Sequence, residues 1–270
     1  MSLRIDERIA RRRDELSPQE RRAAETLLAH LDDLATYRAA ELAGLAGVSK
    51  ATMSRLFRSL GFADFDEVRD HLRSLRVTGE PRRVDGAPDL ANQIAAETTA
   101  IQRTLEQPAL RDAVEVIASA RQVLVVGWRN SYPVALHLRE QLIHARPRVA
   151  IAPAPGQVIG EELADLGPAD VVVAVGFRRR PRGFGAFLTA ANATGAAVVL
   201  LTDPSGGEHV GRARVRLECP VQGPLAYDSY AAAMSLVSVL ADAVLFERGR
   251  SGRTRISAIS DTYELLGEVE

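Results

Sequence analysis

Apolar residues follow two different periods along the chain. Up to about residue 78 they recur at helical spacing, and no convincing strand pattern occurs. Ser17-Pro18 is typical of a helix start, because serine caps free backbone amides and proline fits the first turn. The apolar stripe that follows this start contains Leu27, Leu28, Leu31 and Leu34.

Three further helices are predicted before residue 78. Thr36 could cap a short helix that ends at Gly47, and Ser49 restarts a helix over residues 50–60. Gly61 ends that helix, and residues 64–67 open another, whose apolar side contains Phe65, Val68 and Leu72. The stretch ELAGLAGVSKATMSRLFRSLG (41–61) therefore has the layout of a helix-turn-helix.

Beyond residue 88 the pattern changes to continuous apolar runs that alternate with helical stretches. Such runs are typical of a parallel sheet covered on both faces, so we predict a doubly wound five-stranded α/β domain. The expected strands are residues 122–127, 149–153, 170–176, 196–202 and 215–220, and the expected helices are residues 89–106, 108–119, 133–145, 161–166, 183–194, 226–247 and 254–266.

We therefore expect an all-α helix-turn-helix bundle over residues 1–78 and an α/β domain over residues 89–270. The segment GEPRRVDGAP (79–88) is rich in glycine, proline and charge and is predicted to be a linker. No apolar run approaches the roughly 20 residues that cross a bilayer, and the N-terminus lacks the apolar core of a signal peptide. A cytoplasmic protein without a membrane partner is expected.

Composition and charge narrow the possible functions only slightly. The formal net charge is −1, and residues 1–78 hold 14 basic and 13 acidic side chains, so any surface for a polyanion must be local. Cys219 is the one cysteine, which excludes an intramolecular disulfide and a multi-cysteine zinc site.

The helix over residues 50–60 has the composition of a DNA-recognition helix. Met53, Leu56, Phe57 and Leu60 fall on one face and are expected to pack inward. The N-terminal positions of a recognition helix reach base edges in the major groove. The candidate DNA contacts are Ser49, Lys50, Ala51, Thr52, Ser54, Arg55 and Arg58. On spacing alone, an amphipathic helix of a non-binding bundle with a solvated polar face is an equal alternative.

The run ELAGLAGVSKATMSRLFRSLGFADFDEVRDHLR (41–73) resembles the N-terminal domain of RpiR-type (MurR/RpiR) bacterial transcriptional regulators. The matching residues are Gly47, Val48, Ser49, Ala51, Thr52, Arg55, Leu60, Gly61, Phe62 and Phe65. The resemblance implies DNA binding, and it implies a second half that is a SIS (sugar isomerase) domain, the architecture predicted above. SIS domains usually hold a phosphosugar in loops rich in serine and threonine.

Ligands of an open parallel sheet bind beyond the carboxyl ends of its strands. Three loops there are candidates: GWRNSYP (127–133), GFRRRPRG (176–183) and TDPSGG (202–207). The first departs from the SIS pattern G-x-G-S-S, and the second replaces S-x-S-G-x-T with arginines, which bind anions as bidentate forks. The candidate effector contacts are Gly127, Arg129, Asn130, Ser131, Arg178, Arg179, Arg180, Asp203 and Ser205.

Each of these candidates has a plainer interpretation. The arginine run, which extends to Arg182, could be a solvated face or an interface element, and Asp203-Pro204-Ser205 is also simply a good turn. Trp128 could stack on a sugar ring or pack in a subunit interface.

Catalytic residues are not evident. Glu218 is expected to belong to the last strand, Cys219 to pack in the core, and His137 and His144 to be structural or surface residues. We expect no catalytic residue, cofactor or metal site. The alternatives to a regulator are a SIS-type phosphosugar isomerase and a metabolite sensor that does not bind DNA.

The predicted partners are double-stranded operator DNA, a small anionic effector and further copies of the chain. A dimer would match the two-fold symmetry of a palindromic operator. SIS domains commonly dimerise through helices that flank the sheet, so residues 89–119 and 226–247 are candidates for a homodimer or homotetramer interface, and the helix at 254–266 could cross to a neighbouring subunit.

Overall fold

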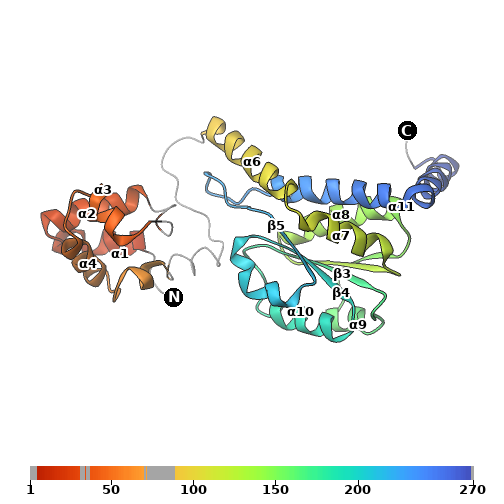
Figure 1. Cartoon of the computed structure of the whole chain (residues 1–270), viewed down its shortest axis with the longest axis horizontal. Helices are drawn as coiled ribbons and strands as arrows, with labels where there is room; N and C mark the ends of the chain where they lie inside the picture. The colour runs from red at the N-terminus through yellow and green to blue at the C-terminus, as the bar shows by residue number, and fades with distance from the viewer. Residues whose placement is uncertain (1–4, 31–33, 35–36, 70, 72–88, 269–270) are drawn as a thin grey trace. The chain divides into compact units, whose positions relative to one another are not determined.

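The computed structural model describes residues 5–30, 34, 37–69, 71 and 89–268. The chain divides into two compact units, residues 1–80 and 81–270, and each is described by itself (Figure 1). The predicted linker at 79–88 lies outside the described residues, as do Leu31, Thr36 and Leu72.

The first unit is helical, as predicted. Its elements are α1 (Ile5–Arg12), η1 (Arg13–Glu15), α2 (Pro18–Ala29), α3 (Ala39–Leu45) and α4 (Lys50–Ser59), and residues 65–69 are also helical. Helix α1 was not predicted from the sequence. Its Ile5 and Ile9 are buried in one core with Leu27, Leu42, Met53, Leu56 and Phe57.

Helix α2 begins at the predicted cap. The Ser17 Oγ accepts the Glu20 N–H at 3.3 Å, and the Glu20 carboxylate accepts the Ser17 N–H at 3.0 Å, which forms a capping box. The Ser17 hydroxyl, which donates to the Glu20 Oε2 at 2.6 Å, and the Ser17 N–H both lower the pKa of the Glu20 carboxyl. The predicted inward stripe is correct for Leu27 and Leu34 but wrong for Leu28, whose side of the helix is exposed.

The described part of the second unit contains a sheet of five parallel strands in the order β2-β1-β3-β4-β5. The strands are β1 (Val123–Gly127), β2 (Val149–Ala152), β3 (Val171–Gly176), β4 (Ala197–Thr202) and β5 (Val215–Glu218). All five predicted strands are present, to within two residues at each end. The order reverses between β1 and β3, which defines a topological switch point at their carboxyl ends.

Helices cover both faces of this sheet (Figure 1). The helices are α6 (Leu90–Leu105), α7 (Ala109–Ser119), α8 (Ser131–Ala145), α9 (Ile159–Leu163), α10 (Phe184–Ala193), η3 (Pro204–Arg212) and α11 (Ala231–Leu266). One core packs α7, α8 and α11 on the sheet, and a second packs α9 and α10 on its other face. Strands β1, β3 and β4 are therefore buried on both sides, which explains their continuous apolar runs.

Two elements differ from the predictions. Helix α11 begins at Ala231 rather than residue 226, and it is kinked at Gly249, where the backbone has φ 54° and ψ −123°. The two expected C-terminal helices are thus the two halves of α11. Residues 204–212 form the helix η3, where the sequence indicated a simple turn. None of the described helices has the length and apolar character needed to cross a membrane.

A buried arginine at the C-cap of α8 binds the carbonyl end of α7. Arg146 is 2% exposed, and its guanidinium donates to the carbonyl oxygens of Ile117, Ala120 (2.7 Å) and Arg121 (3.2 Å). Burial lowers the Arg146 pKa to about 10, so the group remains charged at neutral pH. It satisfies carbonyls that the end of a helix leaves without partners.

Candidate functional site

The turn before α4 is built from a glycine and a serine. Gly47 has φ 61° and lets Val48 N–H donate to Ala43 O at 3.0 Å, which ends α3 in a Schellman motif. The Ser49 Oγ then accepts the Thr52 N–H at 3.1 Å and caps α4. These are the roles that the sequence predicted for Gly47 and Ser49.

Helix α4 separates an apolar face from a polar one. Met53, Leu56 and Phe57 are at most 1% exposed, so this side anchors α4 in the core. Most of the predicted DNA contacts lie on the solvent side: Ser49, Lys50, Ala51, Ser54, Arg55 and Arg58. No acidic residue lies in the first turn of α4, so its cations are not neutralised from within that turn.

Thr52 lies beneath this surface. The residue is 6% exposed, and its Oγ1 lies 3.0 Å from the Ser49 Oγ and accepts the Arg55 Nη2 at 3.3 Å. Thr52 thus connects the Ser49 cap to Arg55, and its buried side chain does not face a base edge.

Helix α1 holds the other end of α4. The Arg8 Nη1 donates to Leu60 O at 2.9 Å, and its guanidinium carbon lies 4.3 Å from the Phe62 ring centroid. Arg12 donates to Ser59 O. The last carbonyls of α4 are thus satisfied from another helix. The sequence signal for α1 was weak, because only Ile5 and Ile9 stand out in a charged segment.

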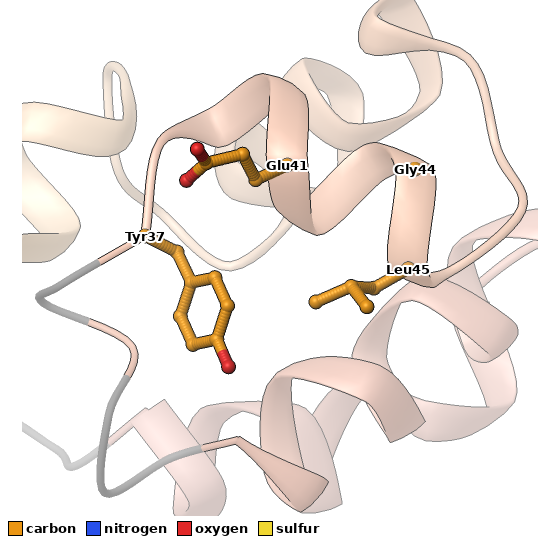
Figure 2. Close-up of a pocket in the computed structure, with 4 residues that line it drawn as sticks. All are labelled: Tyr37, Glu41, Gly44 and Leu45. Atoms are coloured by element: carbon orange, nitrogen blue, oxygen red, sulfur yellow. The ribbon is translucent and has the colours of Figure 1, made fainter.

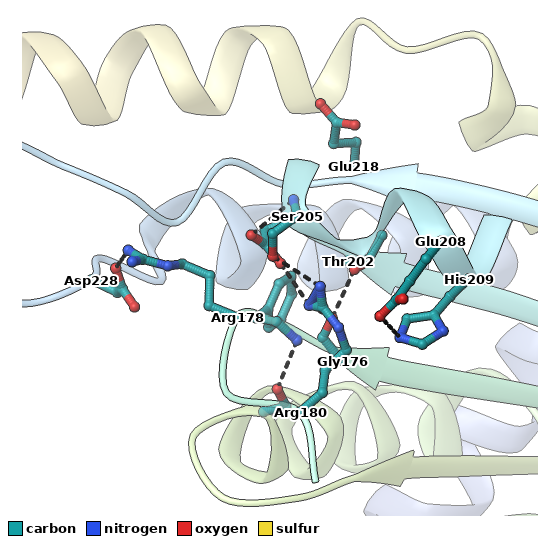
Figure 3. Close-up of polar contacts among 12 residues, drawn as sticks. Gly176, Arg178, Arg180, Thr202, Ser205, Glu208, His209, Glu218 and Asp228 are labelled. Carbon is teal, nitrogen blue, oxygen red and sulfur yellow. Dashed lines mark hydrogen bonds and ion pairs between the residues drawn. The ribbon is translucent and has the colours of Figure 1, made fainter. Parts of the chain in front are cut away.

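In the second unit, the three predicted loops meet at the carboxyl edge of the sheet (Figure 3). Phe177 N–H donates to the Ser131 Oγ at 3.1 Å and joins the first loop to the second. The Thr202 Oγ1 donates to Gly176 O at 2.8 Å and joins the second to the third. These loops lie at the ends of β1, β3 and β4, where open α/β sheets bind ligands.

The first loop contributes both buried and exposed residues. Ser131 is 6% exposed and begins α8, two residues before the predicted start. A Cβ on Gly127 would lie 2.8 Å from Ser131 O, so glycine is required where the strand and helix approach. Arg129, with φ 54°, and Asn130 are exposed beside them.

The second loop holds two arginines in internal ion pairs. The Arg178 Nη1 lies 2.5 Å from the Asp228 Oδ1, and the Arg178 side chain is 7% exposed. The Arg180 Nη1 lies 2.9 Å from the Asp203 Oδ1. A solvated face does not describe these two side chains, because both are largely buried. Arg182 is exposed, and Arg179 is partly buried.

Arg180 connects the second loop to the third. Its guanidinium also donates to Ser205 Oγ at 2.8 Å and to Gly176 O at 3.2 Å. Burial lowers the Arg180 pKa, while Asp203 opposes that shift. The Asp203 Oδ2 accepts the Ser205 N–H at 3.2 Å, so the predicted effector residues Asp203 and Ser205 bind each other and Arg180.

Two residues of this edge were not predicted as site residues. Asp228 and Tyr230 lie in the connection between β5 and α11, and the Tyr230 ring contacts Phe177 edge-on at 5.5 Å. Burial, followed by the charges of Asp228 and Asp203, raises the Tyr230 pKa to about 12, so the phenol stays neutral. Asp228 lies 50 residues from Arg178 in the chain, so sequence spacing could not predict their contact.

A histidine completes the cluster on the α10 side. His209 is 7% exposed, its ring lies 5.2 Å from that of Phe184, and its Nε2 lies 3.3 Å from the Glu208 Oε1 (Figure 3). Burial lowers the His209 pKa, which favours the neutral ring. Trp128 packs edge-on against Phe187 at 5.1 Å, and thus within its own unit.

The residues considered for catalysis have structural roles. Glu218 is the last residue of β5, as predicted, and it pairs with Arg216. Its N–H donates to the Gln107 Oε1 at 2.8 Å. Cys219 is fully buried, and burial raises its pKa to about 12, which confirms that it packs in the core. His137 lies between α8 and α11, 3.4 Å from the Ser238 Oγ.

Surface hollows of the described residues lie elsewhere. One of about 650 Å³ is lined by Tyr37, Glu41, Gly44 and Leu45 on the outer side of α3 (Figure 2). Another, of about 470 Å³ at the amino ends of β1, β3 and β4, contains the bidentate pair of Arg121 and Asp170, with distances of 2.9 and 2.6 Å. No predicted DNA or effector residue lines either hollow.

Comparison with known proteins finds a matching domain family for each unit. Residues 3–75 match the model described as the helix-turn-helix domain of the rpiR family, and residues 116–243 match the SIS domain model. The chain belongs to the RpiR family. Among its relatives is the HTH-type transcriptional regulator HexR of Pseudomonas aeruginosa, 26% identical over 272 residues, with 95% of this chain and 94% of HexR covered.

Other relatives match parts of the chain. The bifunctional protein glk of Burkholderia orbicola is 28% identical over 226 residues, and the match covers 79% of this chain but about a third (35%) of glk. The sugar isomerase domain of the RpiR transcription factor from Sphaerobacter thermophilus has a TM-score of 0.59 at 24% identity, covering 64% of this chain and 98% of that one.

The Vibrio vulnificus NanR protein, solved in complex with ManNAc-6P, matches both units. Its TM-score is 0.60 at 19% identity, with 97% of this chain and 98% of NanR covered. These two structures confirm the predicted fold of a helical unit followed by a SIS-like α/β unit. The RpiR-type chain described here is thus a transcriptional regulator by family.

Proposed function

We propose that this regulator binds operator DNA through α4 and that its SIS-like unit senses a small anionic metabolite. The observation that carries the DNA part is the exposed cationic side of α4. Lys50, Arg55 and Arg58 point to solvent from a capped helix whose opposite side is buried. Such a helix can enter a major groove, with arginine or lysine bonded to guanine or phosphate.

The contacts that we propose follow the exposure of each side chain. Lys50 and Arg55 lie in the first turns and are assigned to base edges or phosphates, and Arg58, one turn later, to phosphate. Ser49, Ala51 and Ser54 are small and permit close approach of the helix. Thr52 is assigned a supporting role, because it is buried against Ser49 and Arg55.

The DNA assignment can be tested on the promoter region of the gene itself. We expect affinity to fall steeply with salt, because bound cations release counterions. Replacing Lys50 and Arg55 with Ala should weaken binding by about 10- to 100-fold and lower the salt slope by about 2. The matched control is Arg111→Ala in the second unit, where an exposed arginine pairs with Glu115 at 3.3 Å. Equal binding by both variants would refute the role of α4.

For the effector, we propose a sugar phosphate or a related anionic carbohydrate derivative. The ManNAc-6P in the NanR complex supports this class for a protein of the same fold. In this chain the loops at 127–131, 176–182 and 202–207 meet at the switch point, where such a ligand would lie. The proposed contacts are Gly127, Arg129, Asn130, Ser131, Arg178, Arg179, Arg180, Asp203 and Ser205.

We further propose that the chain regulates without catalysis and acts as a homodimer or homotetramer in the cytoplasm. The carboxylate considered for acid–base chemistry, Glu218, is paired with Arg216. Exposed apolar side chains on α6 and α11 support a subunit interface there: Leu90, Ile94, Val239 and Phe246. Light scattering of the purified chain would measure the oligomer, and a monomer at micromolar concentration would refute it.

A further inference from the structure

The two ion pairs at the carboxyl edge of the sheet differ in how firmly their acids are held. Asp203 is 5% exposed, and it also caps η3 by accepting the Ser205 N–H. Asp228 is 17% exposed and lies in the irregular connection between β5 and α11. The Asp228 carboxylate can therefore turn into water at a lower cost than the Asp203 carboxylate.

Resting on the function proposed above, we propose that Asp228 is an internal competitor for the effector and that Arg178 is the residue that binds the effector's anionic group. The phosphate or carboxylate of the effector takes the place of the Asp228 carboxylate on the Arg178 guanidinium. A phosphate carries nearly two charges at neutral pH and offers three acceptor oxygens, so it can outcompete a single carboxylate. Arg180 stays on Asp203 and keeps the loops joined.

Displacement of Asp228 would be transmitted by the next residue, Ser229. The Ser229 Oγ donates to the Glu97 Oε1 of α6 at 2.5 Å, and the Gln93 Nε2 donates to the same oxygen at 2.5 Å. Figure 1 shows this connection beside α6. Helix α6 is the first element after the segment that joins the two units in the sequence. The anion site and α6 are thus linked through one pair of adjacent residues.

Replacing the two acids should have different effects on anion binding. We would titrate the full-length chain with inorganic phosphate and with a hexose 6-phosphate by calorimetry. Asp228→Asn removes the competitor and should bind either probe at least tenfold more tightly than the wild type. Asp203→Asn should show no gain, because it breaks the pair with Arg180 that joins the second and third loops, and Arg178→Gln should lose at least tenfold. Asp112→Asn removes an exposed acid of α7; it is the control and should bind both probes as the wild type does. Asp228→Ser serves as a second variant if Asp228→Asn folds poorly.

A second measurement monitors hydrogen exchange in α6. Hydrogen exchange over residues 90–105 should change in the wild type when phosphate binds, and the free Asp228→Asn variant should already show that change. Ser229→Ala should keep the phosphate affinity but lose the change in α6. An equal gain in Asp228→Asn and Asp203→Asn, no gain in Asp228→Asn, or no binding of either probe by any variant would overturn the inference. Salt-dependent operator binding, measured on the same wild-type sample, reports separately on the proposed function.

Discussion

Gly61, at the end of α4, offers a sharp test of how the DNA-binding unit is stabilised. It has φ 82°, and it ends α4 in a Schellman motif, with Phe62 N–H donating to Phe57 O at 2.9 Å. Alanine at this φ costs about 1–2 kcal/mol. The added Cβ would also lie 3.2 Å from the Arg8 Nη1, which must move and weaken its bond to Leu60 O, a loss of about 1 kcal/mol.

We therefore expect Gly61→Ala to destabilise the first unit by about 2–3 kcal/mol, which is roughly 8–24 °C in the Tm of a domain of this size. Differential scanning calorimetry of the full chain would measure it. Gly61→Asn should lose about half as much, because asparagine tolerates positive φ. The matched control is Gly44→Ala in α3, where a Cβ meets nothing within 4 Å and should be neutral or stabilising. If Gly61→Ala proved as stable as Gly44→Ala, the account would be wrong.

Three further predictions concern single charges. Asp170→Asn should cost about 1–3 kcal/mol at pH 7, and the difference from the wild type should shrink below about pH 4. The reason is that hydrogen bonding to Arg121 lowers the Asp170 pKa, so the stabilisation is present above the unfolded pKa and is lost as pH falls through the folded one. Arg146→Met should cost about 2–4 kcal/mol in urea unfolding, because the carbonyls at the end of α7 lose their donor. Glu20→Gln should keep the capping box, because glutamine also serves at this position. It should strengthen DNA binding about two- to fivefold at low salt, because the negative charge of Glu20 attracts Arg55 and competes with the DNA for it. Unchanged binding in a filter assay would contradict this.

The sequence was most informative where local chemistry decides structure. The strands could be predicted because residues buried on both faces of a parallel sheet must be apolar throughout. The turn before α4 could be predicted because Gly47 and Ser49 act within four residues of their partners. Helix α1 escaped prediction, since Ile5 and Ile9 are its main apolar contribution to the core.

The candidate sites were less predictable because they depend on distant partners. The sequence correctly places three loops at one edge of the sheet, which follows from strand order and direction alone. It does not indicate that Arg178 and Arg180 are paired, since Asp228 and Asp203 lie 50 and 23 residues away. Likewise, the burial of Thr52 results from α4 packing on α2 and α3, and its type and spacing alone suit a base contact equally well.

Net charge is a poor guide to either proposed binding surface, and the structure shows why. In the first unit several carboxylates are committed to helix starts: Glu20 to Ser17, Glu41 to the Arg38 N–H at 2.7 Å, and Glu67 to the Ala63 N–H at 2.6 Å. A nearly neutral unit can therefore still expose a cationic helix. The second unit shows the reverse case, in which two arginines of a run, Arg178 and Arg180, are neutralised by internal ion pairs. Each arginine can bind an anionic ligand only if its paired carboxylate can be displaced. The cost of that displacement depends on the burial of the carboxylate and on its loop, rather than on the number of charges.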